Sequence, residues 1–216
     1  MKETDGHGFD LAGARLIALP SGALFWPHEA TLTVSDLHLG RSERIARLGG
    51  GLLPPYEVAD TLMRLDQDIA ATDARTVICL GDTFDDRLAA DLAPDHMGWL
   101  TRLMAGRRWI WIEGNHDPGP VALGGEHRRD LPLGPLIFRH IALPSARDEI
   151  SGHYHPKLRL AGQARACFLC DGARLILPAY GTYTGGMDVS HKDLRPLFAE
   201  RALAFLTGTP VRAVPF

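Results

Sequence analysis

The chain has 216 residues, 45% of them apolar, and a formal net charge of −3. This length and composition are typical of a folded α/β protein, and we expect one domain over residues 1–216. They exclude a membrane-embedded chain, since no apolar run is long enough to span a bilayer. The polar start at 1–7 lacks the apolar core of a signal peptide, so we expect a cytoplasmic protein.

The first half of the chain alternates predicted strands with predicted helices. A Pro-Ser-Gly turn at 20–22 indicates a hairpin before the first central strand. Apolar and β-branched runs predict strands, and apolar stripes at helical spacing predict helices. The strands are expected at 31–34, 76–81 and 108–113, and the helices at 56–71 and about 94–105. This alternation indicates a parallel sheet with right-handed crossovers.

The segment 41–55 follows the first of these strands, and we interpret it as a mobile loop. It is rich in Gly and Pro and carries Arg41, Arg44 and Arg47 at helical spacing. These arginines could line a substrate channel, because a guanidinium matches the oxygens of a phosphate. They could equally form an ordinary solvated face.

The order of elements changes beyond residue 117. The stretch 118–135 is rich in Gly and Pro. Short strands are predicted after it, at 136–140, 148–151, 166–170 and 173–178. They indicate a second, more antiparallel sheet packed on the first. Cys167 and Cys170 fall in one of these strands, where residues three apart face opposite sides, so we expect packing cysteines and no zinc site.

Polar side chains follow four of the predicted strands. Asp36 and His38 come after the strand at 31–34, and residues two apart in an extended chain point to the same side. The other strands end in Gly81-Asp82, in Gly114-Asn115-His116-Asp117 and in Gly152-His153-Tyr154-His155. Each glycine lets the backbone turn sharply. Because ligands bind at the carboxyl ends of strands in open α/β sheets, these oxygen and nitrogen donors predict a site for divalent transition metals.

The succession Asp-x-His, Gly-Asp, Gly-Asn-His-Asp and Gly-His-x-His resembles the signature of the calcineurin-like metallophosphoesterase superfamily over about 31–180. The resemblance implies a four-layer α/β/β/α sandwich of two mixed sheets with two divalent metal ions at the sheet edges. Manganese is the expected metal, and iron or zinc would also suit histidine and oxygen ligands. The implied reaction is phosphodiester hydrolysis by attack of a metal-activated hydroxide on phosphorus.

The same resemblance implies the metal ligands. They are Asp36, His38 and His155 for the first ion, Asn115, His153 and one further histidine for the second, and Asp82 as a bridge between both. We favour His140 as the further histidine, because it ends an apolar strand as the other ligands do. His127, in a hydrophilic loop, is the alternative.

Three more residues receive roles beside the ligands. The resemblance implies that His116 faces the substrate as a catalytic residue, where it would stabilise the transition state or protonate the leaving oxygen. Asp85 and Asp117 could orient metal-binding histidines. Either could instead be a turn residue.

Four further stretches are similar to the ligase-associated DNA damage response endonuclease family, at 25–27, 35–40, 151–156 and 177–186. This similarity implies a DNA endonuclease in DNA repair, linked in bacteria with an ATP-dependent DNA ligase, an exonuclease and a helicase. Tyr180 and Tyr183 in the last stretch could stack on a base, or the stretch could be a structural turn. Because the net charge is acidic, we expect single-stranded or flapped DNA to be favoured over intact duplex.

Two other classes of function remain open from the sequence. A small-molecule phosphoesterase, such as a nucleotide phosphodiesterase, would carry the same metal site. A UDP-diacylglucosamine pyrophosphatase shares the Ser-Asp-Leu-His-Leu start at 35–39, but its apolar lipid-binding insertion has no counterpart in this sequence. A non-catalytic scaffold on the same fold would have lost metal ligands or the catalytic histidine, whereas this chain retains them.

Overall fold

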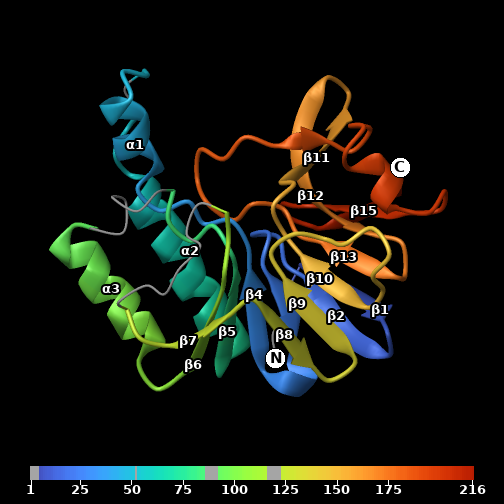
Figure 1. The fold of residues 1–216 in the computed structure, drawn as a ribbon, viewed down its shortest axis with the longest axis horizontal. Helices are drawn as coiled ribbons and strands as arrows, with labels where there is room; N and C mark the ends of the chain where they lie inside the picture. Colours follow the sequence, from blue (N-terminus) through green and yellow to red (C-terminus); the bar gives the residue numbers. More distant parts are fainter. Residues whose placement is uncertain (1–4, 52, 86–91, 116–122) are drawn as a thin grey trace.

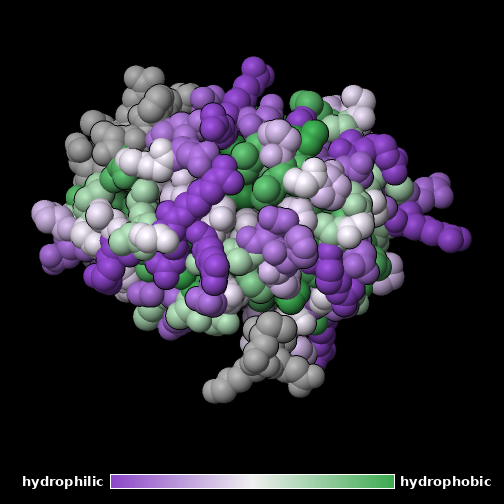
Figure 2. Space-filling view, turned by 90° about the horizontal axis from the view of Figure 1, so that it is seen from below, coloured by the Kyte–Doolittle hydropathy of each residue, from purple (hydrophilic) through white to green (hydrophobic). Residues whose placement is uncertain are grey.

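Two β-sheets packed face to face make up most of the molecule, and the two longer α-helices lie on the outer side of the first sheet (Figure 1). The computed structural model describes residues 5–51, 53–85, 92–115 and 123–216. Within these ranges no helix has the length and apolar character needed to cross a bilayer. On the face seen from below, hydrophilic and hydrophobic side chains are mixed (Figure 2).

The first sheet contains the polar strand ends of the first half of the chain. Its strands, in spatial order, are β1 (His7–Leu11), β2 (Ala14–Ala18), β3 (Leu24–Trp26), β4 (Thr31–Val34), β5 (Thr76–Leu80), β6 (Arg108–Ile112) and β7 (Glu126–Arg128). A 3₁₀ turn, η1 (Pro27–Glu29), joins β3 to β4. Strands β1 to β4 pair antiparallel, and β4 to β7 pair in parallel. Helices α2 (Glu57–Thr72) and α3 (Pro94–Met104) lead back to β5 and β6, so β4, β5 and β6 end at one edge.

The second sheet follows the path β14-β11-β12-β13-β10-β9-β8, and β15 and β16 join it at β12. Its strands are β8 (Asp130–Leu133), β9 (Leu136–Arg139), β10 (Glu149–Ser151), β11 (Pro156–Leu160), β12 (Gln163–Cys170), β13 (Arg174–Ile176), β14 (Met187–Asp188), β15 (Leu203–Leu206) and β16 (Arg212–Pro215). Strand β10 pairs in parallel with β9 and β13. The carboxyl ends of β9 and β10 therefore also lie at one edge.

Apolar side chains fill the spaces between successive layers. Ile78 belongs to the cluster between the sheets, and Leu62 of α2 to the cluster between the helices and the first sheet. On the outer face of the second sheet, Leu169 packs in a cluster with Phe198, which follows the 3₁₀ turn η2 (Arg195–Leu197). This order confirms the four-layer sandwich. In the described part of the chain, the fourth layer contains η2 and extended segments instead of an α-helix.

The segment 41–55 is not simply a loop, because helix α1 (Arg41–Arg47) begins it. Ser42 Oγ donates a hydrogen bond to Glu57 Oε2 at 2.7 Å, which ties α1 to the start of α2. A short helix of this kind is stabilised by tertiary contacts. An apolar stripe did not predict it, since Ser42 is the only one of its residues that is buried.

The Gly- and Pro-rich stretch 118–135 also contains two strands, β7 and β8, that the sequence did not predict; residues 118–122 lie outside the described part. Strand β7 is short and its side chains do not alternate between buried and exposed, so it leaves no period-two pattern. The prediction that Cys167 and Cys170 are packing residues is confirmed. Cys167 packs on the outer face of the second sheet and Cys170 packs between the sheets.

Candidate metal centre

Five strands are followed by polar side chains at their carboxyl ends. They are β4 with Asp36 and His38, β5 with Asp82, β6 with Asn115, β9 with His140, and β10 with His153 and His155. The left-handed backbone is found at Asp36 (φ 53°), His38 (φ 47°), Asp82 (φ 45°), His153 (φ 71°) and His155 (φ 46°). This conformation costs a residue other than glycine about 1–2 kcal/mol. Backbone strain concentrated in this way is typical of a functional site.

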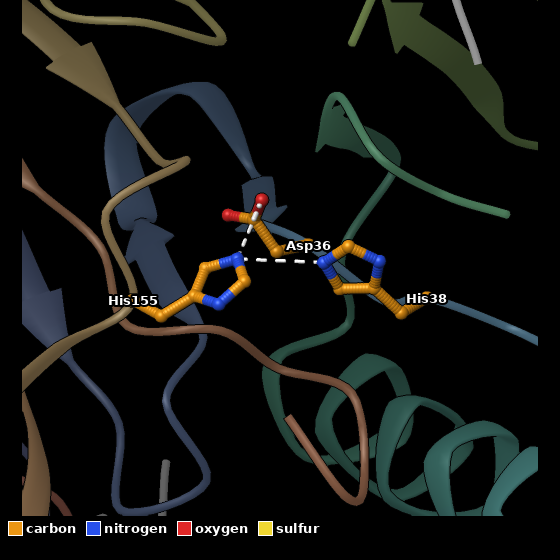
Figure 3. A group of neighbouring side chains, drawn as sticks. All are labelled: Asp36, His38 and His155. Atoms are coloured by element: carbon orange, nitrogen blue, oxygen red, sulfur yellow. Dashed lines mark hydrogen bonds and ion pairs between the residues drawn. The ribbon is translucent and has the colours of Figure 1, made fainter. Parts of the chain in front are cut away.

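The first group of these side chains consists of Asp36, His38 and His155, which point toward one another (Figure 3). His155 Nε2 lies 3.0 Å from Asp36 Oδ1 and 3.4 Å from His38 Nε2. Asp36 is wholly buried, His38 is buried and His155 is partly accessible. One carboxylate oxygen and two imidazole nitrogens thus converge, and together they could hold a divalent ion.

Asp85 fixes the orientation of His38. Its Oδ1 lies 2.9 Å from His38 Nδ1, so this nitrogen carries the proton and Nε2 faces the group. Burial opposes the ionisation of Asp85, but His38 and the guanidinium groups of Arg44 and Arg41 outweigh it and lower the pKa of Asp85 to about 2. Asp85 is therefore ionised near neutral pH, as a carboxylate that orients a histidine must be.

The structure places Arg41 and Arg44 beside Asp85. Arg41 Nη1 lies 2.9 Å from Asp85 Oδ1, and Arg44 Nη1 lies 3.0 Å from Asp85 Oδ2. Their side chains are 24% and 32% exposed, while the carboxylate is fully buried. Removing either charge would leave the buried carboxylate less compensated. We therefore assign both arginines to the support of Asp85, and their contact with substrate remains a prediction.

We expect Asp85→Asn to weaken metal binding at the first group by about 10–100-fold, the usual effect of removing a carboxylate that orients a metal-binding histidine. The amide keeps the size of the side chain but removes its charge. Calorimetric titration with Mn²⁺ measures the change. Asp10→Asn is the matched control, because Asp10 is a 68% exposed carboxylate on β1, paired with Arg15. Equal affinities in the two variants would contradict the role of Asp85.

The second group consists of Asp82, His140 and His153, joined by the amide of Asn115. Asn115 Oδ1 lies 2.9 Å from both His140 Nε2 and His153 Nδ1. Asp82 Oδ2 lies 3.5 Å from His140 Nε2. The Leu80 carbonyl oxygen lies 2.8 Å from His140 Nδ1 and accepts a hydrogen bond from its N–H, so His140 Nε2 is directed to the group.

The structure brings His140 into the second group and leaves His127 outside both. His127 lies on β7, in register with Trp111 of β6. Neither group of side chains suited to a metal includes it among the residues described. The preference for His140 over His127 therefore agrees with the geometry.

The two groups are direct neighbours. The His153 backbone N–H donates a hydrogen bond to Asp36 Oδ2 at 2.9 Å, and His140 Nδ1 lies 4.0 Å from Asp36 Oδ1. A side chain at Gly152 would overlap Ser35 Oγ, so glycine is required where the end of β10 approaches the loop after β4. The proximity is what a two-metal centre needs. The bridging role of Asp82 remains a prediction.

The buried carboxylates create a demand for positive charge. Burial opposes protonation of His140, but Asp82 and Asp36 outweigh it and raise the pKa of His140 to about 9. Burial also opposes ionisation of Asp36, yet His155 and His140 keep the pKa of Asp36 below its ordinary value. Burial and the charge of His140 lower the pKa of His153. Either a proton on His140 or a bound metal ion would compensate the negative charge of the buried carboxylates. This donor set therefore fits divalent cations.

The stretch 177–186 is hydrogen-bonded to the backbone of the loop after β4. Tyr180 N–H donates to the Ser35 carbonyl at 2.7 Å, and Gly181 N–H donates to the Asp36 carbonyl at 3.1 Å. A Cβ atom at Gly181 would overlap the backbone carbonyl of the residue after Asp36, so a larger residue would displace the loop. The stretch is therefore a structural turn, which was one of its two interpretations.

Tyr180 cannot stack on a base, and this part of the prediction is wrong. Its side chain is wholly buried, its hydroxyl donates to Asp68 Oδ2 at 2.8 Å, and Arg64 lies over its ring at 4.9 Å. The sequence could not show this, because a tyrosine in a glycine-rich loop is as compatible with a buried position as with an open one. Tyr183 is partly exposed, with its ring centroid 5.6 Å from that of Tyr56. Its contact with substrate remains a prediction.

His116 and Asp117 lie outside the described residues, and their roles remain predictions. Two supporting groups were missed by the sequence. Ser35 Oγ donates a hydrogen bond to the Asp36 carboxylate, and the Leu80 carbonyl orients His140. Ser35 directly precedes a predicted ligand, which is a usable signal. A backbone carbonyl gives no signal in the sequence.

Comparison with known proteins agrees with this geometry. Residues 31–191 match the family model described as calcineurin-like phosphoesterase. The structure is similar to the crystal structure of the nuclease MPE from Pseudomonas putida, with a TM-score of 0.74 and 25% identity over 98% of this chain and 100% of that one. A predicted phosphoesterase from Streptococcus pneumoniae matches 86% of this chain and 95% of its own with a TM-score of 0.35 and 16% identity, too weakly to bear on function. None of the curated proteins matches the sequence.

Proposed function

Because the chain belongs to the calcineurin-like phosphoesterase family, we propose that it is a dinuclear metal-dependent phosphodiesterase whose substrate is DNA. The observation that carries the proposal is the pair of adjacent donor groups, Asp36, His38 and His155 beside Asp82, His140 and His153. Their spacing suits two ions that act on one phosphate. Manganese is the metal we propose, with iron and zinc as the alternatives compatible with these donors.

The residues of the chain would hold and orient the two ions. Asp36, His38 and His155 would hold the first, and Asn115, His140 and His153 the second, with Asp82 shared. When bound, such a pair of ions supplies an acidified water as nucleophile and neutralises the oxygens of the phosphate. Asp85 keeps the Nδ1 proton on His38, and the Leu80 carbonyl keeps the Nδ1 proton on His140, so that both Nε2 atoms present a lone pair.

His116 directly follows the ligand Asn115 in the sequence. We propose that its imidazole contacts the phosphate or the leaving oxygen and donates a proton there. A positioned acid of this kind typically contributes about 10²–10⁴-fold to the rate.

One observation supports DNA as the substrate, and the net charge bears on which form of DNA is bound. The structural similarity to the Pseudomonas putida nuclease extends over nearly the whole of both chains. The acidic net charge of −3 disfavours a tight grip on continuous duplex, so we propose single-stranded or flapped DNA. A role in DNA repair, alongside an ATP-dependent ligase, an exonuclease and a helicase in the cytoplasm, is the corresponding cellular proposal. The three buried free cysteines are compatible with such a reducing compartment.

A side-by-side activity screen with Mn²⁺ tests this function. The substrates are single-stranded, flapped and duplex DNA, RNA, nucleotides and sugar-nucleotides. We expect the single-stranded and flapped DNA to be cleaved fastest, and an Asp82→Asn protein prepared in parallel excludes a contaminating nuclease. Rapid turnover of a nucleotide or sugar-nucleotide without DNA cleavage would replace the nuclease by a small-molecule phosphoesterase, the alternative function of this family.

A further inference from the structure

A hollow of about 410 Å³ opens beside the second donor group. Asn115 and His140 form part of its wall, so a molecule bound in it would adjoin the proposed second metal ion. The rest of the lining includes Glu113, Arg129, Ile141 and Leu143. Neither the metal centre nor the support of its ligands uses these four side chains.

Arg129 is the cation of this hollow that can bind an anion. The guanidinium of the other lining arginine, Arg139, lies 3.3 Å from Asp130 and 3.7 Å from Glu149 and is 12% exposed, so its charge is already compensated. Arg129 is exposed, and no ion pair joins it to any residue of the described chain. Its neighbour Arg128 differs, because it pairs with Glu126 at 3.2 Å.

The wall next to His140 is apolar. Ile141 and Leu143 are 41% and 50% exposed, whereas Ala142 between them is 3% exposed. The two branched side chains therefore share the open side of the chain, directly after a proposed metal ligand. Apolar side chains in such a place can pack on the face of a nucleic-acid base. Carboxylates accept hydrogen bonds from the exocyclic amino group of cytosine. The exposed carboxylate of Glu113 could accept such a bond from the base.

We propose that this hollow binds the nucleotide next to the scissile phosphate of a single-stranded nucleic acid. The base packs on Ile141 and Leu143, and its phosphate, not the scissile one, pairs with Arg129. A single strand is required, because a base stacked in a duplex does not present its face to a side chain. This inference rests on the proposed nuclease function and specifies the residues that select its substrate.

A second hollow, of about 380 Å³, adjoins residues of both donor groups. It is lined by His153 and His155 and also by Tyr154, Met187 and His191. Open space beside Asn115 and His140, and also beside His153 and His155, gives room for a chain longer than one nucleotide. An enclosed pocket for a small molecule would not need this additional space.

Steady-state kinetics of Arg129→Gln tests the inference. The substrates are a single-stranded DNA oligonucleotide, the RNA of the same sequence and bis(4-nitrophenyl) phosphate, which has no second phosphate. We expect the KM for the oligonucleotide to rise about tenfold, and the slope of log KM against log salt to fall by about 0.7, the value for one phosphate contact on a single strand. The small diester should be affected much less. Arg128→Gln is the matched control, since Arg128 lies outside the hollow and pairs with Glu126.

A second variant, Ile141→Ser with Leu143→Ser, removes the apolar wall. It should raise the KM for single strands several-fold without changing the salt slope, because it removes no charge. An unchanged oligonucleotide KM in both variants, or equal losses on the oligonucleotide and the small diester, would overturn the inference while leaving the nuclease in place. A wild-type protein that cleaves the small diester but neither oligonucleotide would overturn the nuclease itself. Melting temperatures equal to that of the wild type show that the variants are folded.

Discussion

Asp82→Asn is expected to deprive the protein of both metal ions and to lower phosphodiester cleavage by at least about 10³-fold. A carboxylate placed between two cations can bind both, whereas a neutral amide binds them poorly. Asparagine has the same shape as aspartate and tolerates the left-handed backbone at this position, where φ is 45°. The substitution therefore tests the charge of Asp82 and not the fold around it.

Elemental analysis after saturation with Mn²⁺ and desalting measures this prediction, together with the cleavage rate of bis(4-nitrophenyl) phosphate. Asp10→Asn serves again as the control, because this exposed carboxylate is paired with Arg15. If Asp82→Asn retained one ion at full occupancy, Asp82 would belong to a single group, as its distance of 3.5 Å from His140 already allows. The bridging assignment would then fail, although the two groups would remain.

His140→Ala is expected to remove one ion and to retain the other. The retained ion would be the one held by Asp36, His38 and His155, which form a group without His140. We expect cleavage to fall by at least about 10²-fold, because a single ion cannot neutralise both the attacking and the leaving oxygen. Metal analysis of the variant should give one ion per chain.

His127→Ala is the matched histidine control. His127 lies on β7 beside Trp111, in neither donor group of the described residues, so its removal should change neither the metal content nor the rate. The opposite result, loss of an ion in His127→Ala and not in His140→Ala, would show that the second group has been assigned to the wrong histidine.

The two candidate metal-binding groups could be predicted from the sequence because their signals are local. A short polar motif after an apolar strand specifies both the ligand and its place at a sheet edge. Asp36 with His38 and His153 with His155 are such motifs, and the structure brings them together. The central strands and the helices α2 and α3 were predictable for the same reason, since their apolar periodicity lies within one segment.

The support of the centre could not be predicted, because it depends on contacts between distant segments. Arg41 and Arg44 bind Asp85 about 40 residues further on. Tyr180 fixes the Ser35 carbonyl across most of the chain. From the sequence, the arginines could contact a phosphate and the tyrosine could stack on a base, because both contacts are chemically reasonable. In the structure Tyr180 is buried, and both arginines pair with the buried carboxylate of Asp85.

The number of metal ions bound per chain tests the two-metal centre most directly. The wild-type protein, saturated with Mn²⁺ and freed of excess metal, should contain two ions per chain by elemental analysis. Its activity towards bis(4-nitrophenyl) phosphate should disappear on chelation and return with Mn²⁺. A protein that cleaves this diester with one ion per chain, or with none, would contradict the account.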